Sequence, residues 1–162
     1  MSSAVLRNQI ADYLWTGGDN GGYKLMGAGF NSLDEAPSAQ VTTRTYISDA
    51  AGYTSVRSYK TKFSFDTDLI ADEDAIKELY DIGRNQLTGD GAQRDFVRVE
   101  LFSPVSGQTG VYAARKFTVA AEISKCSGAG GEAVQVTGAL HSVGPFTDGT
   151  FNVNDKTFTA AE

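Results

Sequence analysis

The residues best suited to chemistry are few in this chain. Its 162 residues include one histidine, His141, and one cysteine, Cys126. A metal site with two histidine ligands is therefore excluded, and so are an internal disulfide and a zinc site made of cysteines. A serine hydrolase triad would have to use His141, but no Gly-Xaa-Ser-Xaa-Gly motif is present to hold the nucleophile.

Two further patterns suggest a calcium-binding loop and a phosphate-binding loop, but neither has the residues that such a loop needs. Asp66, Asp68 and the three acids at 72–74 suggest calcium, but an EF-hand loop needs a glycine and an oxygen ligand where Ala71 and Ile70 stand. The glycine-rich run 128–132 lacks the Gly-Lys-Ser/Thr of a phosphate loop. We interpret the first as a solvated helix start and the second as a turn. The sequence thus predicts no catalytic site, no bound metal and no cofactor.

The elements that would position any site are mostly strands. Apolar and polar residues alternate with a period of two, which is typical of strands with one buried face. One segment, 73–84, has the apolar spacing of a helix, with Ile76, Leu79 and Tyr80 on one stripe. The predicted strands are 12–15, 23–26, 41–47, 59–65, 97–101, 117–123, 134–140, 149–153 and 156–159. We expect a single domain over 1–162 that is mainly β (α+β), a β-sandwich with one flanking helix.

Composition and charge exclude several classes of protein. The chain is 41% hydrophobic and 21% charged, which is incompatible with a wholly disordered chain. Its net charge of −6 argues against a protein that binds nucleic acid non-specifically, because such a protein needs a basic surface. No apolar run approaches the ~18 residues that a membrane span needs, and no signal peptide is recognisable. We expect a soluble protein that is made inside a cell.

The composition of two segments is not what packing into the core of one domain would require. Residues 42–58 form a long polar excursion with two tyrosines, Tyr46 and Tyr53, and either a floppy hairpin or an interface would explain it. The first twelve residues carry Val5, Leu6 and Ile10 among polar neighbours. They fit either an arm that docks on a neighbour or the first strand of the domain.

Short motifs spread along nearly the whole chain carry a family resemblance. They occupy residues 4–10, 25–30, 45–49, 58–63, 65–68, 75–86, 114–117, 130–132 and 149–152, of which the helix at 75–86 is the most telling. In this order the motifs resemble the major tail proteins (tail tube proteins) of long-tailed, non-contractile bacteriophages, in particular those of Gram-positive hosts.

The resemblance implies a structural virion protein of the tail-tube fold, without enzymatic activity or cofactor. Six copies would form a ring, and rings would stack into a tube that conducts double-stranded DNA into the host without binding it specifically. The further partners would be the tape measure, tail tip and tail terminator proteins, with no membrane contact. The protein would be made in the bacterial cytoplasm and end in the virion tail.

The resemblance also assigns roles to segments and residues. Residues 42–57 would be the extended inter-ring loop, residues 1–12 an N-terminal stacking arm, and 157–162 a second arm. Two acids on polar strand faces, Glu100 and Glu122, are candidates for the lumen. The expected loop contacts are Arg44, Tyr46, Asp49, Tyr53 and Arg57, and the expected arm contacts are Val5, Leu6, Arg7 and Ile10.

Other functions remain open at this stage. The inner tube of a contractile tail or of a secretion system would share the same sandwich and ring. A monomeric β-sandwich module that binds a ligand such as a sugar would use exposed aromatics, for which Trp15, Tyr23, Tyr53 and Tyr112 are the candidates. An enzyme of unknown type is the third alternative.

Overall fold

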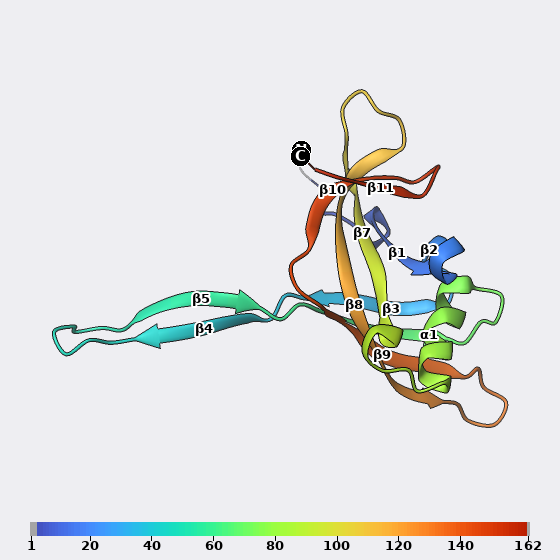
Figure 1. The fold of residues 1–162 in the computed structure, drawn as a ribbon, viewed down its shortest axis with the longest axis horizontal. Coiled ribbons are helices and arrows are strands. Elements are labelled where there is room, and N and C mark those ends of the chain that lie inside the picture. The colour runs from blue at the N-terminus through green and yellow to red at the C-terminus, as the bar shows by residue number, and fades with distance from the viewer. Residues whose placement is uncertain (1–2, 162) are drawn as a thin grey trace.

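The computed structural model of the chain describes residues 3–161 and consists mainly of strands (Figure 1). The helical elements are η1 (Arg7–Gln9), η2 (Gly18–Asn20), α1 (Asp74–Arg84) and η3 (Gly89–Ala92). The strands are β1 (Ile10–Thr16), β2 (Gly22–Leu25), β3 (Phe30–Ala36), β4 (Ala39–Arg44), β5 (Tyr53–Tyr59), β6 (Lys62–Asp68), β7 (Gln93–Pro104), β8 (Val111–Ser127), β9 (Gln135–Ser142), β10 (Thr147–Asn152) and β11 (Thr157–Ala160).

Nine of these strands form one curled sheet, in which seven follow the order β2-β1-β7-β8-β9-β6-β3 and the other two, β10 and β11, branch from β8. The 17-residue β8 joins its two layers, because residues 111–116 pair with β10 and residues 119–127 pair with β9. β11 extends the sheet beyond β10. The curl brings β3 back over β1 and β7, where Arg98 donates a hydrogen bond to the Leu33 carbonyl. The predicted fold class is confirmed: a mainly β, sandwich-like fold with one helix and a long hairpin.

The curled sheet encloses two apolar cores. The larger one lies between the layers and beneath α1, and the smaller one covers the other face of β1 and β7. The largest fully buried side chain of the smaller core is Phe151 of β10, and the ring centroids of Tyr13 and Phe151 are 4.5 Å apart. All of Phe96–Val99 in β7 is buried as a result. The alternation predicted that the face of Val97 and Val99 lies in a core, and this face packs in the smaller core. The face of Arg98 is buried as well, because Phe96 on that face belongs to the larger core.

The helix α1 closes one end of the larger core. It buries Ala75, Ile76, Leu79 and Ile82, so the predicted helix 73–84 is confirmed almost to the residue. Gly83 lies directly against Ile123 of β8, where a Cβ atom would come within 2.8 Å of that side chain. Glycine at this position lets the helix approach the sheet closely. No helix within residues 3–161 is long and apolar enough to cross a membrane.

The strands β4 and β5 form a separate two-stranded hairpin that projects far from the rest of the molecule, hereafter the body (Figure 1). None of its residues is buried, and every residue of β5 is exposed. The predicted strand 59–65 is interrupted at 60–61, where the chain passes from hairpin to body: Tyr59 is 63% exposed, whereas Phe63 is fully buried. Strand β3 was not predicted.

Candidate functional site

The single histidine belongs to a small exposed cluster rather than to a catalytic triad. Its Nε2 lies 2.7 Å from Oε1 of Glu122, and the Ser124 hydroxyl donates to the other oxygen of the same carboxylate at 2.7 Å. The hydrogen bonds from His141 and then Ser124 lower the pKa of Glu122. Because the serine donates to the carboxylate and not to the imidazole, nothing activates it as a nucleophile.

The described part of the chain also holds no group of side chains suited to a metal ion. Within residues 3–161, no three side chains of the His, Cys, Asp and Glu types are grouped so as to hold a metal ion. Two acids of α1 are each paired with one base instead: Asp74 lies 3.6 Å from Lys24, and Glu78 accepts from Arg94 at 2.7 Å. Cys126 is exposed at the end of β8.

A buried ionic cluster ties the two layers of the sandwich together. Arg98 donates to both carboxylate oxygens of Asp12, at 2.8 and 3.3 Å, and to Glu35 at 3.2 Å. Arg115 donates to both oxygens of Glu35, at 3.1 and 2.8 Å, and Arg7 donates to Asp12 at 2.9 Å. This cluster was not predicted, because its hydrogen-bonded partners lie up to 86 residues apart in the sequence.

The ionisation of the cluster follows from its contacts. Burial by itself would raise the pKa of Glu35, but the hydrogen bonds and charges of Arg115 and Arg98 hold that pKa below its ordinary value. Burial would likewise lower the pKa of Arg98, yet Asp12 and Glu35 raise it. Glu35 and Arg98 are therefore both charged at neutral pH. The cluster fixes β3, the strand from which the hairpin departs, onto β1, β7 and β8.

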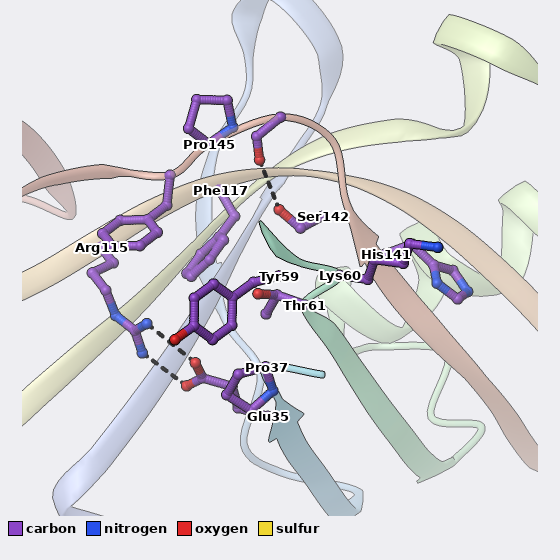
Figure 2. Close-up of a pocket in the computed structure, with 12 residues that line it drawn as sticks. Glu35, Pro37, Tyr59, Lys60, Thr61, Arg115, Phe117, His141, Ser142 and Pro145 are labelled. Atoms are coloured by element: carbon purple, nitrogen blue, oxygen red, sulfur yellow. Dashed lines mark hydrogen bonds and ion pairs between the residues drawn. The ribbon is translucent and has the colours of Figure 1, made fainter. Parts of the chain in front are cut away.

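Where the hairpin joins the body, the surface is hollowed into a groove of about 840 Å³, hereafter the basal groove (Figure 2). Tyr59 at the end of β5 stands in it beside Phe117, with its hydroxyl directed toward the Arg115–Glu35 pair (Figure 2). The lining residues are Glu35, Pro37, Tyr59, Lys60, Thr61, Arg115, Phe117, His141, Ser142, Gly144, Pro145 and Phe146.

The hairpin has one face that is more apolar than the other. Val41 lies opposite Val56, and the Thr43 and Thr54 hydroxyls meet at 2.9 Å, so these four side chains share a face. A register shift after Gln40 leaves Arg57 unpaired and brings Tyr59 opposite Ala39. Val41 is 57% exposed and Val56 is 53% exposed. The apolar face therefore runs from the middle of the hairpin to the basal groove, and nothing within residues 3–161 covers it.

The tip of the hairpin is an ordered turn. The Asp49 carboxylate accepts from the Tyr46 backbone at 2.9 Å, and the Asp49 backbone donates to the Tyr46 carbonyl at 3.0 Å. Between them Ile47 is completely exposed, at 109% of its reference area. Tyr46, Asp49 and Tyr53, which were expected as loop contacts, do lie near the tip, whereas Ile47, Val41 and Val56 were not singled out beforehand.

The N-terminal segment is shorter than predicted. Ile10 already belongs to β1, where it pairs with Glu100, and Asp12 is buried, so only residues 3–9 of the expected arm lie outside the sheet. The first two residues of that arm are outside the described chain. Val5 and Leu6 are exposed. Arg7 anchors the segment to the body, through Asp12 and the Leu33 carbonyl.

The two acids expected at a lumen lie on opposite faces of the sheet. Glu100 pairs with Ala113 and shares its face with Phe96 and Arg98. Glu122 alternates with Val119 and Ile123, whose side chains belong to or pack on the larger core, so it points away from that core. A wall formed by one face of this sheet would therefore display only one of the two.

The chain is similar to known proteins in its structure but not in its sequence. No protein-family model matches the chain, and no curated protein matches it in sequence. The tail of an empty gene transfer agent particle, refined with C6 symmetry, is similar with a TM-score of 0.59 at 14% identity, over 97% of this chain and 100% of that one. The virion of a native gene transfer agent particle gives 0.58 at 12% identity over the same shares. The chain has a tail-subunit fold.

A third similar structure comes from a different kind of particle. The baseplate of an anti-feeding prophage, symmetrised six-fold, gives a TM-score of 0.52 at 8% identity over 94% of this chain and 99% of that one. All three similarities cover almost the entire chain, so the likeness concerns the whole architecture and not a shared fragment.

Proposed function

We propose that this chain is the repeating structural subunit of a phage-type tail tube, in which hexameric rings stack along the tube axis. The observation that carries the proposal is the projecting hairpin with its uncovered apolar face. Two-stranded hairpins are marginally stable by themselves in water. Soluble monomers also rarely leave contiguous apolar surface exposed. A hairpin of this kind therefore serves as a contact element, and the tail-subunit fold favours a second copy as its partner.

The distribution of charge supports contacts between copies. The hairpin, residues 39–59, contains two arginines and one aspartate, a net charge of +1. Because the whole chain carries −6, the remainder carries −7. A cationic projection and an anionic body attract each other in a head-to-tail arrangement, and head-to-tail contacts generate rings or open filaments.

The proposed role requires no catalytic step and no cofactor. Arg44, Tyr46, Asp49, Tyr53 and Arg57 would contact the neighbouring ring, and the segment before β1, with Val5 and Leu6, would add a smaller contact. The negative net charge, multiplied sixfold in a ring, would keep DNA phosphates from adhering to the tube wall. On the face that lines the lumen, either Glu100 or Glu122 would contribute to this repulsion.

The remaining features of the proposal concern the particle. Tape measure, tail tip and terminator proteins would bound the tube, which would lie in the virion and conduct DNA at ejection. We favour a non-contractile tail of the type that infects Gram-positive bacteria. The likeness to an anti-feeding prophage baseplate keeps the inner tube of a contractile or secretion-type machine as the second candidate.

Negative-stain electron microscopy over a range of protein concentrations tests the proposal. The wild-type chain is expected to form hollow rods or stacked rings. A variant in which residues 42–55 are replaced by an Asn-Gly turn should keep the circular dichroism spectrum and melting temperature of the body but remain monomeric. Wild-type protein that stays monomeric at every concentration would contradict the proposal, as would a truncated variant that assembles equally well.

A further inference from the structure

The basal groove has a preorganised floor. The Arg115 guanidinium lies over the rings of both Phe117 and Phe146, at 5.3 and 5.4 Å from their centroids. Glu35 holds it from the other side through two hydrogen bonds. Cation–π contacts and a bidentate carboxylate restrict all of these side chains. A partner that enters the groove would therefore lose little free energy to ordering its walls.

The groove is also incompletely filled. Phe146 remains 46% exposed although it packs against Phe117, and Tyr59, which also lines the groove, is 63% exposed. Aromatic side chains of this kind, held around a central pocket, are typical of the residues that dominate binding energy at protein interfaces. The groove thus offers an apolar seat for a side chain that the chain itself does not supply.

The hairpin tip presents a side chain of the matching kind. Ile47 is completely exposed, and the two Asp49 hydrogen bonds hold the turn that carries it. Charge is complementary as well: Asp49 is the one charged residue in 45–52, whereas Glu35, Lys60 and Arg115 give the groove a net charge of +1. Tip and groove therefore fit each other in both polarity and charge.

The tip cannot reach the groove of its own chain. The groove lies at the root of the hairpin, where Tyr59 lines it, and the tip lies at the far end (Figure 1). The seven residues of β5 separate the two by about 24 Å at the rise of an extended strand. Any contact between tip and groove must therefore join two copies.

We propose that the hairpin tip of one copy, with Tyr46 and Ile47, docks in the basal groove of a neighbouring copy. This inference rests on the proposed self-assembly and names the surface that receives the hairpin. Each copy then carries one donor, at the tip of its hairpin, and one acceptor, in the groove at the root of that hairpin. Occupation of the groove also places the donor beside the root of the acceptor's own hairpin, next to Pro37 and Thr61.

Disulfide trapping tests this contact in the assembled full-length protein. In a Cys126→Ser background, Ile47→Cys is combined with Pro145→Cys, since both positions are exposed. Mild oxidation of assemblies should give a ladder of linked multimers on a non-reducing gel, and the single-cysteine variants should not. Two matched pairs serve as controls: Ile47→Cys with Asp72→Cys tests the acidic start of α1 as acceptor, and Leu6→Cys with Pro145→Cys tests the N-terminal segment as occupant.

A thermodynamic cycle gives a second readout. Ile47→Ser and Phe146→Ala should each raise the critical concentration of assembly by about tenfold, or 1.4 kcal/mol. Because both remove the same contact, the double variant should be no worse than the single ones. Both side chains are exposed, so the body should fold normally in each case.

The outcomes separate this inference from the proposed function. Three outcomes would overturn the docking site without contradicting the proposed tail subunit. Rods could form without the 47–145 disulfide, or a control pair could form the disulfide instead. The double variant could also raise the critical concentration by about a hundredfold, the sum of two independent losses. Wild-type protein that never assembles would overturn both.

Discussion

Val99 and Val56 are the same side chain in two strands of one molecule, yet Val99 is fully buried and Val56 is 53% exposed. The body buries both faces of its central strands and even its charges, with Arg98 held among carboxylates. The hairpin buries no side chain, although it has the alternating pattern of a strand. The comparison teaches that stability and assembly reside in different residues, so each should be breakable without the other.

The largest expected effect is on the body. Asp12→Ala removes a carboxylate that is 1% exposed and leaves Arg98 buried with only Glu35 as a charged partner. Breaking a buried ion pair in this way typically costs about 3–5 kcal/mol. Urea unfolding of the monomeric, hairpin-truncated protein measures the loss. Arg7→Ala is the control: its side chain is 51% exposed, so the same measurement should change by less than about 1 kcal/mol.

The same chemical change should have opposite consequences in the two regions. Val99→Ser loses the burial of a valine and places a hydroxyl in the smaller core, so we expect a loss of about 3 kcal/mol in unfolding free energy. Val56→Ser should change it by less than about 0.5 kcal/mol, because the side chain lies at the surface. Assembly should show the reverse order, with Val56→Ser giving the greater loss in sedimentation experiments at a temperature where both variants are folded.

Acid should weaken the body through Glu35. The pKa of this carboxyl is lowered in the folded protein, so the unfolded chain takes up its proton first as pH falls below the ordinary value of 4.5. The stability that Glu35 contributes is therefore present above that pH and is lost as pH falls toward the folded pKa. Glu35→Gln should cost about 2 kcal/mol at pH 7. Its penalty should shrink in melts at lower pH, and a penalty that stays constant from pH 7 to pH 3.5 would contradict this account.

The smallest effect on stability is expected from the charges of the hairpin. Arg44→Glu with Arg57→Glu replaces two exposed side chains, so the unfolding free energy should stay within about 0.5 kcal/mol of wild type. Assembly should weaken most at low salt, where charges are poorly screened, and its salt dependence should diminish. Light scattering between 0.05 and 0.5 M salt measures this, and unchanged assembly would show that the contact is purely apolar.

Many of the helices and strands of the body could be predicted from local patterns in the sequence. The helix was located because Ile76 and Leu79 recur at helical spacing. β6, β8 and β9 were located because apolar and polar residues alternate along their sequences. β3 escaped prediction because Leu33 is its one fully buried residue and a register shift between Phe30 and Ser32 disturbs its alternation. A strand can be predicted from its residue pattern only where several of its side chains pack in a core.

The site was less predictable because it depends on which strands become neighbours. Arg98 and Glu35 are 63 residues apart, and nothing near either one in the sequence marks the pair. The opposite orientation of Glu100 and Glu122 likewise follows from the register of β7, β8 and β9. Tyr46 and Tyr53 were singled out because a long polar segment seldom carries tyrosines. The basal groove escaped prediction because it is assembled from β3, β5, β8 and the loop after β9.

The narrow root of the hairpin has a mechanical consequence. Two short connections link β4 and β5 to the body, at 37–38 and 60–61; Ser38 has a positive φ of 51° there, and one backbone hydrogen bond of 3.1 Å joins Lys60 to Ser38. A hairpin that turned as a unit about this root would act as a lever: a rotation of about 10° would move a tip about 24 Å away by about 4 Å. Copies coupled through such arms can tilt against one another while each body keeps its shape. A filament built in this way would bend by adding small rotations at many pivots, without any subunit having to unfold.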